Sequence, residues 1–169
     1  MAASQRPRGS VSCVEGPGDT SAGHPAAPAV AGRWELLECR SVDDDGATTG
    51  RPLGEHPRGL VIYTPGGWMS GQLAATSRPA VESADPLRGP PDQRAAAYST
   101  YVAYWGRYAI TGDRIIHHVH SSLVPGWAGT EQVRYFSLSG DTLVLRTTPM
   151  QLAGAITVTE LTWRRAESW

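Results

Sequence analysis

The chain has 169 residues, of which 40% are hydrophobic, and a formal net charge of −1. This length supports one domain with a single core, and the near-zero charge gives no electrostatic basis for binding nucleic acid or an anionic membrane. Because no apolar run approaches the ~20 residues of a membrane-spanning helix and the N-terminus has no apolar signal core, we expect a cytoplasmic protein.

The first 28 residues consist mainly of Ala, Ser, Gly, Pro and Arg, with hardly a large apolar side chain. Such a segment cannot offset its ordering entropy by burial, so residues 1–28 are predicted to be a disordered tail. The remaining residues, 29–169, are predicted to form one domain. Two cysteines, Cys13 and Cys39, make no disulfide framework and are expected to be free thiols.

From about Val30 the chain becomes a series of short segments with period-two alternation, rich in β-branched and aromatic residues and separated by Gly, Pro and Asp. This pattern predicts antiparallel strands joined by tight turns. The predicted strands are Arg33–Ser41, Gly59–Thr64, Trp68–Ala74, Trp105–Thr111, Arg114–Ser122, Glu131–Ser139, Asp141–Thr147 and Ala155–Arg165. Eight such strands favour an all-β, antiparallel up-and-down barrel, which has room inside for one small ligand.

One segment between the third and fourth predicted strands has helical character. Pro91 and Asp92 precede a run of strong helix formers, so a helix is predicted to begin near Pro91. Tyr98, Tyr101 and Trp105 follow at helical spacing. We expect this inserted helix to plug or cover one end of the barrel, after a long Pro-rich connection over residues 77–90.

Several sequence blocks together resemble the bacterial and fungal lipocalin-like domain family. Gly32-Arg33-Trp34 is similar to the Gly-x-Trp signature of lipocalins, and Trp163-Arg164-Arg165 supplies an arginine of the kind that stacks on that tryptophan in lipocalins. The other blocks are Arg58–Ser70, Tyr101–Tyr108, His117–Val119, Pro125–Thr130 and Gln132–Arg134. The resemblance implies a lipocalin-like barrel over roughly residues 30–165. It also implies ligand carriage or cofactor-free cyclisation in natural-product pathways, as in barrels of similar shape.

Strand alternation assigns an inner face that is apolar toward one end and carries polar groups toward the other. His117 and Arg134 are the candidate catalytic residues. The candidate ligand-binding residues are Tyr63, Met69, Tyr104, Tyr108, Gln132, Phe136 and Thr159.

Each catalytic candidate has a functional and a structural interpretation. His117 titrates near neutrality and would act as a general acid or base, or it simply hydrogen-bonds a core tyrosine. Arg134 would stabilise a carboxylate, an enolate or a polarised carbonyl. Alternatively, Arg134 forms an internal ion pair with Glu160, if the last strand is shifted by one residue.

The cluster His117-His118-Val119-His120 raises the question of a metal. On a strand, His118 and His120 share one face about 7 Å apart, but no third ligand stands at a recognisable spacing. A solvated outer face is therefore favoured over zinc, and a haem bound through His117 is favoured less still. We expect no metal and no cofactor.

Two functions of different class follow for a pocket that works without a cofactor. The first is a cofactor-independent cyclase or isomerase acting on a hydrophobic secondary metabolite. The alternative is a non-catalytic carrier of a small apolar ligand, and a purely structural or protein-binding barrel is the third option. The expected partner is a small hydrophobic ligand or substrate, without nucleic acid or membrane, bound to a monomer or homodimer.

Overall fold

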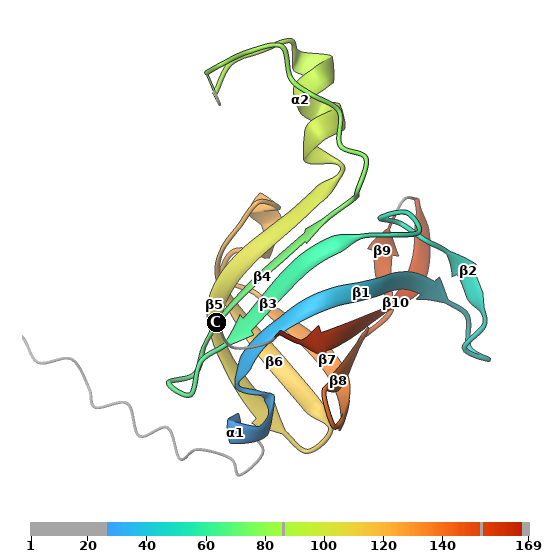
Figure 1. Cartoon of the computed structure of the whole chain (residues 1–169), viewed down its shortest axis with the longest axis vertical. Helices are drawn as coiled ribbons and strands as arrows, with labels where there is room; N and C mark the ends of the chain where they lie inside the picture. The colour runs from blue at the N-terminus through green and yellow to red at the C-terminus, as the bar shows by residue number, and fades with distance from the viewer. Residues whose placement is uncertain (1–26, 86, 153, 167–169) are drawn as a thin grey trace, which may run out of the picture.

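Eight long strands close into one antiparallel barrel in the computed structural model, which describes residues 27–85, 87–152 and 154–166 (Figure 1). Each barrel strand pairs with the next along the chain, and the last returns to pair with the first. The strands are β1 (Gly32–Val42), β3 (Arg58–Tyr63), β4 (Trp68–Ala74), β5 (Tyr101–Thr111), β6 (Arg114–Ser122), β7 (Glu131–Ser139), β8 (Thr142–Thr147) and β10 (Ala155–Arg165). The predicted up-and-down barrel is confirmed. Its strands could be predicted because period-two alternation between tight turns is a strong local signal. The predicted disordered tail lies outside the described residues, apart from its last two.

Two short strands at one end of the barrel were not predicted. β2 (Thr48–Gly50) folds back on β1, and β9 (Met150–Leu152) folds back on β10. Three residues are too few to show an alternation pattern, so the sequence gives no signal for them. Both strands extend the barrel wall beyond the end of β1 and the start of β10 (Figure 1).

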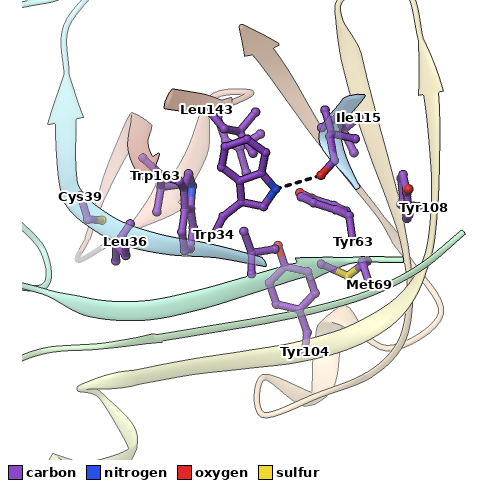
Figure 2. Packing of buried hydrophobic residues seen from close by; sticks show 14 of the residues in the cluster. Trp34, Leu36, Cys39, Tyr63, Met69, Tyr104, Tyr108, Ile115, Leu143 and Trp163 are labelled. Carbon is purple, nitrogen blue, oxygen red and sulfur yellow. Dashed lines mark hydrogen bonds between the residues drawn. The ribbon is translucent and has the colours of Figure 1, made fainter. Parts of the chain in front are cut away.

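A four-residue helix and a tryptophan seal the opposite end. Helix α1 (Ala27–Val30) presents the Val30 carbonyl to Trp34, whose Nε1 donates a 2.9 Å hydrogen bond to it. Val30 and Trp34 are both fully buried, and the Trp34 indole lies among the packed core residues (Figure 2). The Arg165 guanidinium stacks 4.1 Å from the centre of the Trp34 ring and donates to the Ala31 carbonyl, which confirms the stacking arginine that the resemblance implies.

Helix α2 (Pro91–Tyr98) begins at Pro91 as predicted but does not cover the barrel. It projects beyond the ends of β4 and β5 and has no buried residue, so the prediction of a lid was wrong (Figure 1). Its second half contains three alanines, Ala95 to Ala97, which offer little apolar surface to bury against the barrel. Tyr101 and Trp105, expected at helical spacing, belong to β5. No helix in the described part of the chain has the length and apolar character to span a membrane.

A β-bulge on β6 depends on Gly106 of β5. The register shifts so that Trp105 pairs with Ser121 while Gly106 pairs with Val119, which leaves His120 as the extra residue. A Cβ atom at Gly106 would lie 2.0 Å from the His118 carbonyl oxygen, so only glycine permits this close approach.

Truncating the fully buried Trp34 should destabilise the barrel far more than truncating a half-exposed tryptophan. We expect Trp34→Ala to lower the free energy of unfolding by about 3–5 kcal/mol, because it opens a cavity and removes the Arg165 stacking and the Val30 hydrogen bond. The matched control Trp105→Ala, at a site that is 47% exposed, should cost about 1 kcal/mol or less. Urea denaturation measures both values, and equal losses would show that Trp34 does not seal the barrel.

Candidate functional site

A cavity of about 110 Å³ lies inside the barrel toward the end extended by β2 and β9. The lining includes residues from all eight barrel strands, and most of its side chains are Val, Leu, Met or Trp, among them Trp127 of the short 3-10 helix η1 (Pro125–Trp127). The polar lining side chains are Cys39, Tyr104, His117, Arg134, Thr147 and Thr159. An apolar cavity with a few converging polar groups is the usual form of a small-molecule site.

His117 is held between two tyrosines at the inner wall of the cavity. Its Nε2 lies 2.8 Å from Tyr63 Oη and its Nδ1 lies 3.0 Å from Tyr104 Oη. His117 is fully buried, and burial lowers its pKa well below the usual range, with the nearby Arg134 charge acting in the same direction. The imidazole is therefore neutral, donating from one ring nitrogen and accepting at the other.

Arg134 carries a buried charge that no carboxylate balances among the described residues. It is 6% exposed, and its Nη1 donates to the adjacent Val133 carbonyl at 2.9 Å, with a long 3.5 Å contact from Nη2 to Gln132 Oε1. The alternative of an ion pair with Glu160 was wrong. Glu160 pairs with Arg40 across the β1–β10 seam instead.

Two threonines continue the polar surface from Arg134 across the neighbouring strands. Thr147 of β8 lies directly opposite Arg134 in the sheet, and its Oγ1 accepts a 2.9 Å hydrogen bond from the Thr159 backbone of β10. We call Arg134, Thr147 and Thr159 the polar wall. Thr159 Oγ1 and Nε1 of the cavity-lining Trp163 are both buried, and neither has a hydrogen-bond partner among the residues that the structure describes. Buried polar atoms are normally paired, so these two are sites where a ligand or water would bind.

The sequence-predicted residues fall into two groups. Tyr104, His117, Arg134 and Thr159 line the cavity. The other five, Tyr63, Met69, Tyr108, Gln132 and Phe136, do not line it. Tyr63 is hydrogen-bonded to His117, and Tyr108 donates to the Thr64 carbonyl at 2.9 Å. Met69 belongs to the hydrophobic core, and Phe136 packs against that core. Gln132 contacts Thr130 and Arg134.

Several lining residues were missed by the sequence analysis. Cys39 faces inward because the β1 register shifts between Leu36 and Glu38, which reverses the alternation; burial raises the pKa of its thiol to about 12. Trp127 packs edge-on against Tyr104, with 5.7 Å between ring centres, and belongs to a Pro-Gly-Trp turn that has no strand periodicity. Leu53, Met150 and Leu152 come from the mouth of the barrel and had no pattern to indicate them.

The other histidines of the cluster lie on the outer surface. His118 Nδ1 lies 3.2 Å from Glu131 Oε1, and His120 packs between the rings of Trp68 and Trp105. Across residues 27–85, 87–152 and 154–166, no group of three or more His, Cys, Asp or Glu side chains is arranged to hold a metal ion. Both ring nitrogens of His117 are hydrogen-bonded, which leaves none for a haem iron.

Comparisons with known proteins assign the sequence of this chain to a family. The model of a family described as lipocalin-like domain matches residues 31–166. A 4'-hydroxy-3'-methoxypropiophenone carrier protein of Aspergillus oryzae is 34% identical over 106 residues, which cover 57% of this chain and 96% of that protein. The crystal structure of a mutant of the fluorescent protein UnaG is 13% identical, covering 82% of this chain and 96% of that one, with a TM-score of 0.37. A likeness at that score carries no argument.

The neutral state of His117 predicts a specific acid sensitivity. Because its pKa is lowered in the folded state, the unfolded chain takes up a proton below about pH 6.5 that the folded barrel excludes, so stability falls as the pH drops through this value. His117→Gln keeps a donor and an acceptor but does not titrate. Below pH 6.5 we expect the free energy of unfolding to fall with decreasing pH in both proteins. The slope for the variant should be smaller than that for the wild type by about 1.4 kcal/mol per pH unit. Urea denaturation from pH 7.5 to 5 measures the slopes.

The control for this experiment is His120→Gln on the outer surface, which should keep the wild-type slope. If His117→Gln also keeps it, His117 is not the buried neutral base that the hydrogen bonds to Tyr63 and Tyr104 describe.

Proposed function

This chain belongs to the lipocalin-like domain family, and we propose that it binds a small hydrophobic molecule inside the barrel and carries it. The observation that carries the proposal is the apolar cavity with a polar wall on one side. Its unpartnered Thr159 hydroxyl and unbalanced Arg134 charge are groups that a ligand would satisfy. A barrel that served only as a structural unit would gain stability from filling this space with side chains.

The cavity volume sets the size of the ligand. An engineered protein cavity of ~150 Å³ holds one benzene molecule. This cavity, at about 110 Å³, is smaller than that but not fully enclosed, so it would hold about one aromatic ring whose substituents extend past Leu53 and Leu152. The fungal relative is named as the carrier of a single-ring aryl ketone, which is a molecule of this size class. A role in secondary metabolism, with a cargo of the same kind, is therefore part of the proposal.

Carriage fits the geometry better than proton transfer by His117. A general base must reach the ligand with a free nitrogen, but both ring nitrogens of His117 are occupied by tyrosine hydroxyls. The low pKa of His117 also makes it a poor proton acceptor. His117 thus orients Tyr104 at the cavity wall.

One observation favours a second candidate, a cofactor-independent cyclase or isomerase. The Tyr104 hydroxyl lines the cavity and is hydrogen-bonded at 3.0 Å to His117, so it is placed to donate a proton to a ligand oxygen and recover it. Arg134, which lines the same cavity from β7, two strands away, would stabilise an enolate formed during such a reaction.

The carrier proposal predicts binding that is lost when the cavity is filled. We expect the wild type to bind 4'-hydroxy-3'-methoxypropiophenone, and Gly71→Val to weaken binding at least about tenfold, because the added methyl groups enter the cavity. A Cβ at Gly71 meets only ordinary contacts at 3.6 Å, so the barrel should still fold. The matched control is Gly50→Val in β2, outside the lining. Isothermal titration calorimetry measures the affinities, and equal affinity in both variants would place the ligand elsewhere.

Catalysis and carriage are separated by following the ligand itself. As a carrier, the protein should return candidate ligands unchanged after prolonged incubation, as judged by liquid chromatography and mass spectrometry. If a cyclised or isomerised product forms, Tyr104→Phe should reduce turnover by 10²-fold or more while changing affinity by less than about threefold. Product formation that survives this change would exclude Tyr104 as the proton donor.

A further inference from the structure

No carboxylate in the described part of the chain lies beside the Arg134 charge in the cavity. Among the lining residues that the structure describes, none is Asp or Glu. The long 3.5 Å contact to Gln132 and the bond to the Val133 carbonyl satisfy some donors of the guanidinium, but neither acceptor carries a negative charge. A guanidinium stays protonated even when buried. Its burial without a counter-charge costs several kcal/mol, which a bound anion would offset.

No other titratable group in the cavity changes this balance. His117, Tyr104 and Cys39 are the remaining titratable side chains of the lining. The pKa of His117 is lowered by burial and by Arg134, and the pKa of Cys39 is raised to about 12, so neither is charged near neutral pH. The cavity therefore has a positive potential from a single source, in surroundings where screening is weak.

The hydroxyls of the polar wall add donors on the same side as this charge. Thr147 and Thr159 lie on the two strands that follow Arg134 around the barrel, and Thr159 Oγ1 has no partner. A hydroxyl beside a guanidinium, with apolar walls opposite, is suited to one anionic oxygen attached to an apolar ring. Hydrogen bonds between charged partners are about twice as strong as those between neutral ones.

We propose that the ligand is an acidic aromatic molecule bound as its oxyanion, with the anionic oxygen at the polar wall, and that Arg134 determines this specificity. The inference rests on the proposed ligand-binding function and adds the ionisation state of the ligand. An ionised phenol and an aromatic carboxylate present the same chemistry to Arg134, so the experiment includes a probe of each kind. Neutral ethers and cationic amines of the same size are discriminated against.

A phenol whose absorbance reports its ionisation tests this directly. The phenolate of 4-hydroxyacetophenone absorbs at longer wavelength than the phenol, so its pKa is measured by titrating pH with the intact protein in excess. We expect the ionisation midpoint to fall by at least about one pH unit on binding, which corresponds to tenfold tighter binding of the anion than of the neutral form. At about pH 9, where the phenol is ionised both free and bound, its methyl ether, 4-methoxyacetophenone, should bind at least tenfold more weakly. Benzoate binding would identify the carboxylate as an equivalent ligand.

Variants then assign the effect to Arg134. Arg134→Met, of similar length without the charge, should abolish the shift of the phenol midpoint while changing the affinity for the ether by less than about threefold. Arg134→Lys keeps the charge and should retain part of the shift. The control Arg114→Met removes an exposed arginine on the outer surface and should leave the midpoint unchanged. If Arg134→Met does not fold, the wild-type midpoint still decides whether the ligand binds as its anion, and the size of the shift in Arg134→Lys decides whether Arg134 causes it.

The outcomes separate this inference from the function on which it rests. Equal binding of the phenol and its ether, with no shift of the midpoint, would overturn the oxyanion assignment and leave ligand binding intact. Failure of every aromatic probe to bind would overturn the proposed function and this inference with it. A shift that persists in Arg134→Met would refute the role of Arg134 while keeping the anionic ligand.

Discussion

The pairing of β1 with β10 is the interaction on which the rest of the structure depends. Without it the sheet would be open, and both of its edge strands would expose unpaired backbone groups to water. Closure removes the inner face from solvent, and the Trp34 seal completes this at one end. Inside the closed barrel, burial disfavours the charged form of His117, and the electrostatic field of the Arg134 guanidinium is only weakly screened by water.

The interior keeps one charge, on Arg134, and holds its histidine neutral. His117 and Arg134 face the same cavity, and two adjacent cations there would repel each other. The tyrosines on either side of His117 prevent this repulsion, because their hydroxyls form hydrogen bonds with both ring nitrogens and so stabilise the neutral imidazole. One fixed positive charge among apolar walls is a simple basis for ligand selectivity. The apolar walls would contact an aromatic ring, and the guanidinium would bind an anionic oxygen on that ring.

The sequence predicted what depends on local periodicity and missed what depends on exceptions to it. His117 and Arg134 were expected on the inner face because alternation places them there, and both lie in the cavity. Cys39 was missed because one bulge reverses the alternation of β1. Trp127 and the residues of β9 come from short segments without a period, and the position of α2 depends on tertiary packing that its alanines do not specify.

The antiparallel seam also has a mechanical consequence. Trp34, near the start of β1, pairs with Arg165 at the end of β10, so the two places where the chain enters and leaves the barrel lie side by side. Pulling them apart would load the seam one residue pair at a time, as in a zipper, rather than shearing all its hydrogen bonds together. The first contacts to bear the force include the hydrogen bond from the Ala166 N–H to the Arg33 carbonyl and the stacking of Arg165 on Trp34. The barrel is therefore expected to resist force least when the start of β1 and the end of β10 are pulled apart. An unfoldase that pulls on either of these two points would load the barrel in this direction.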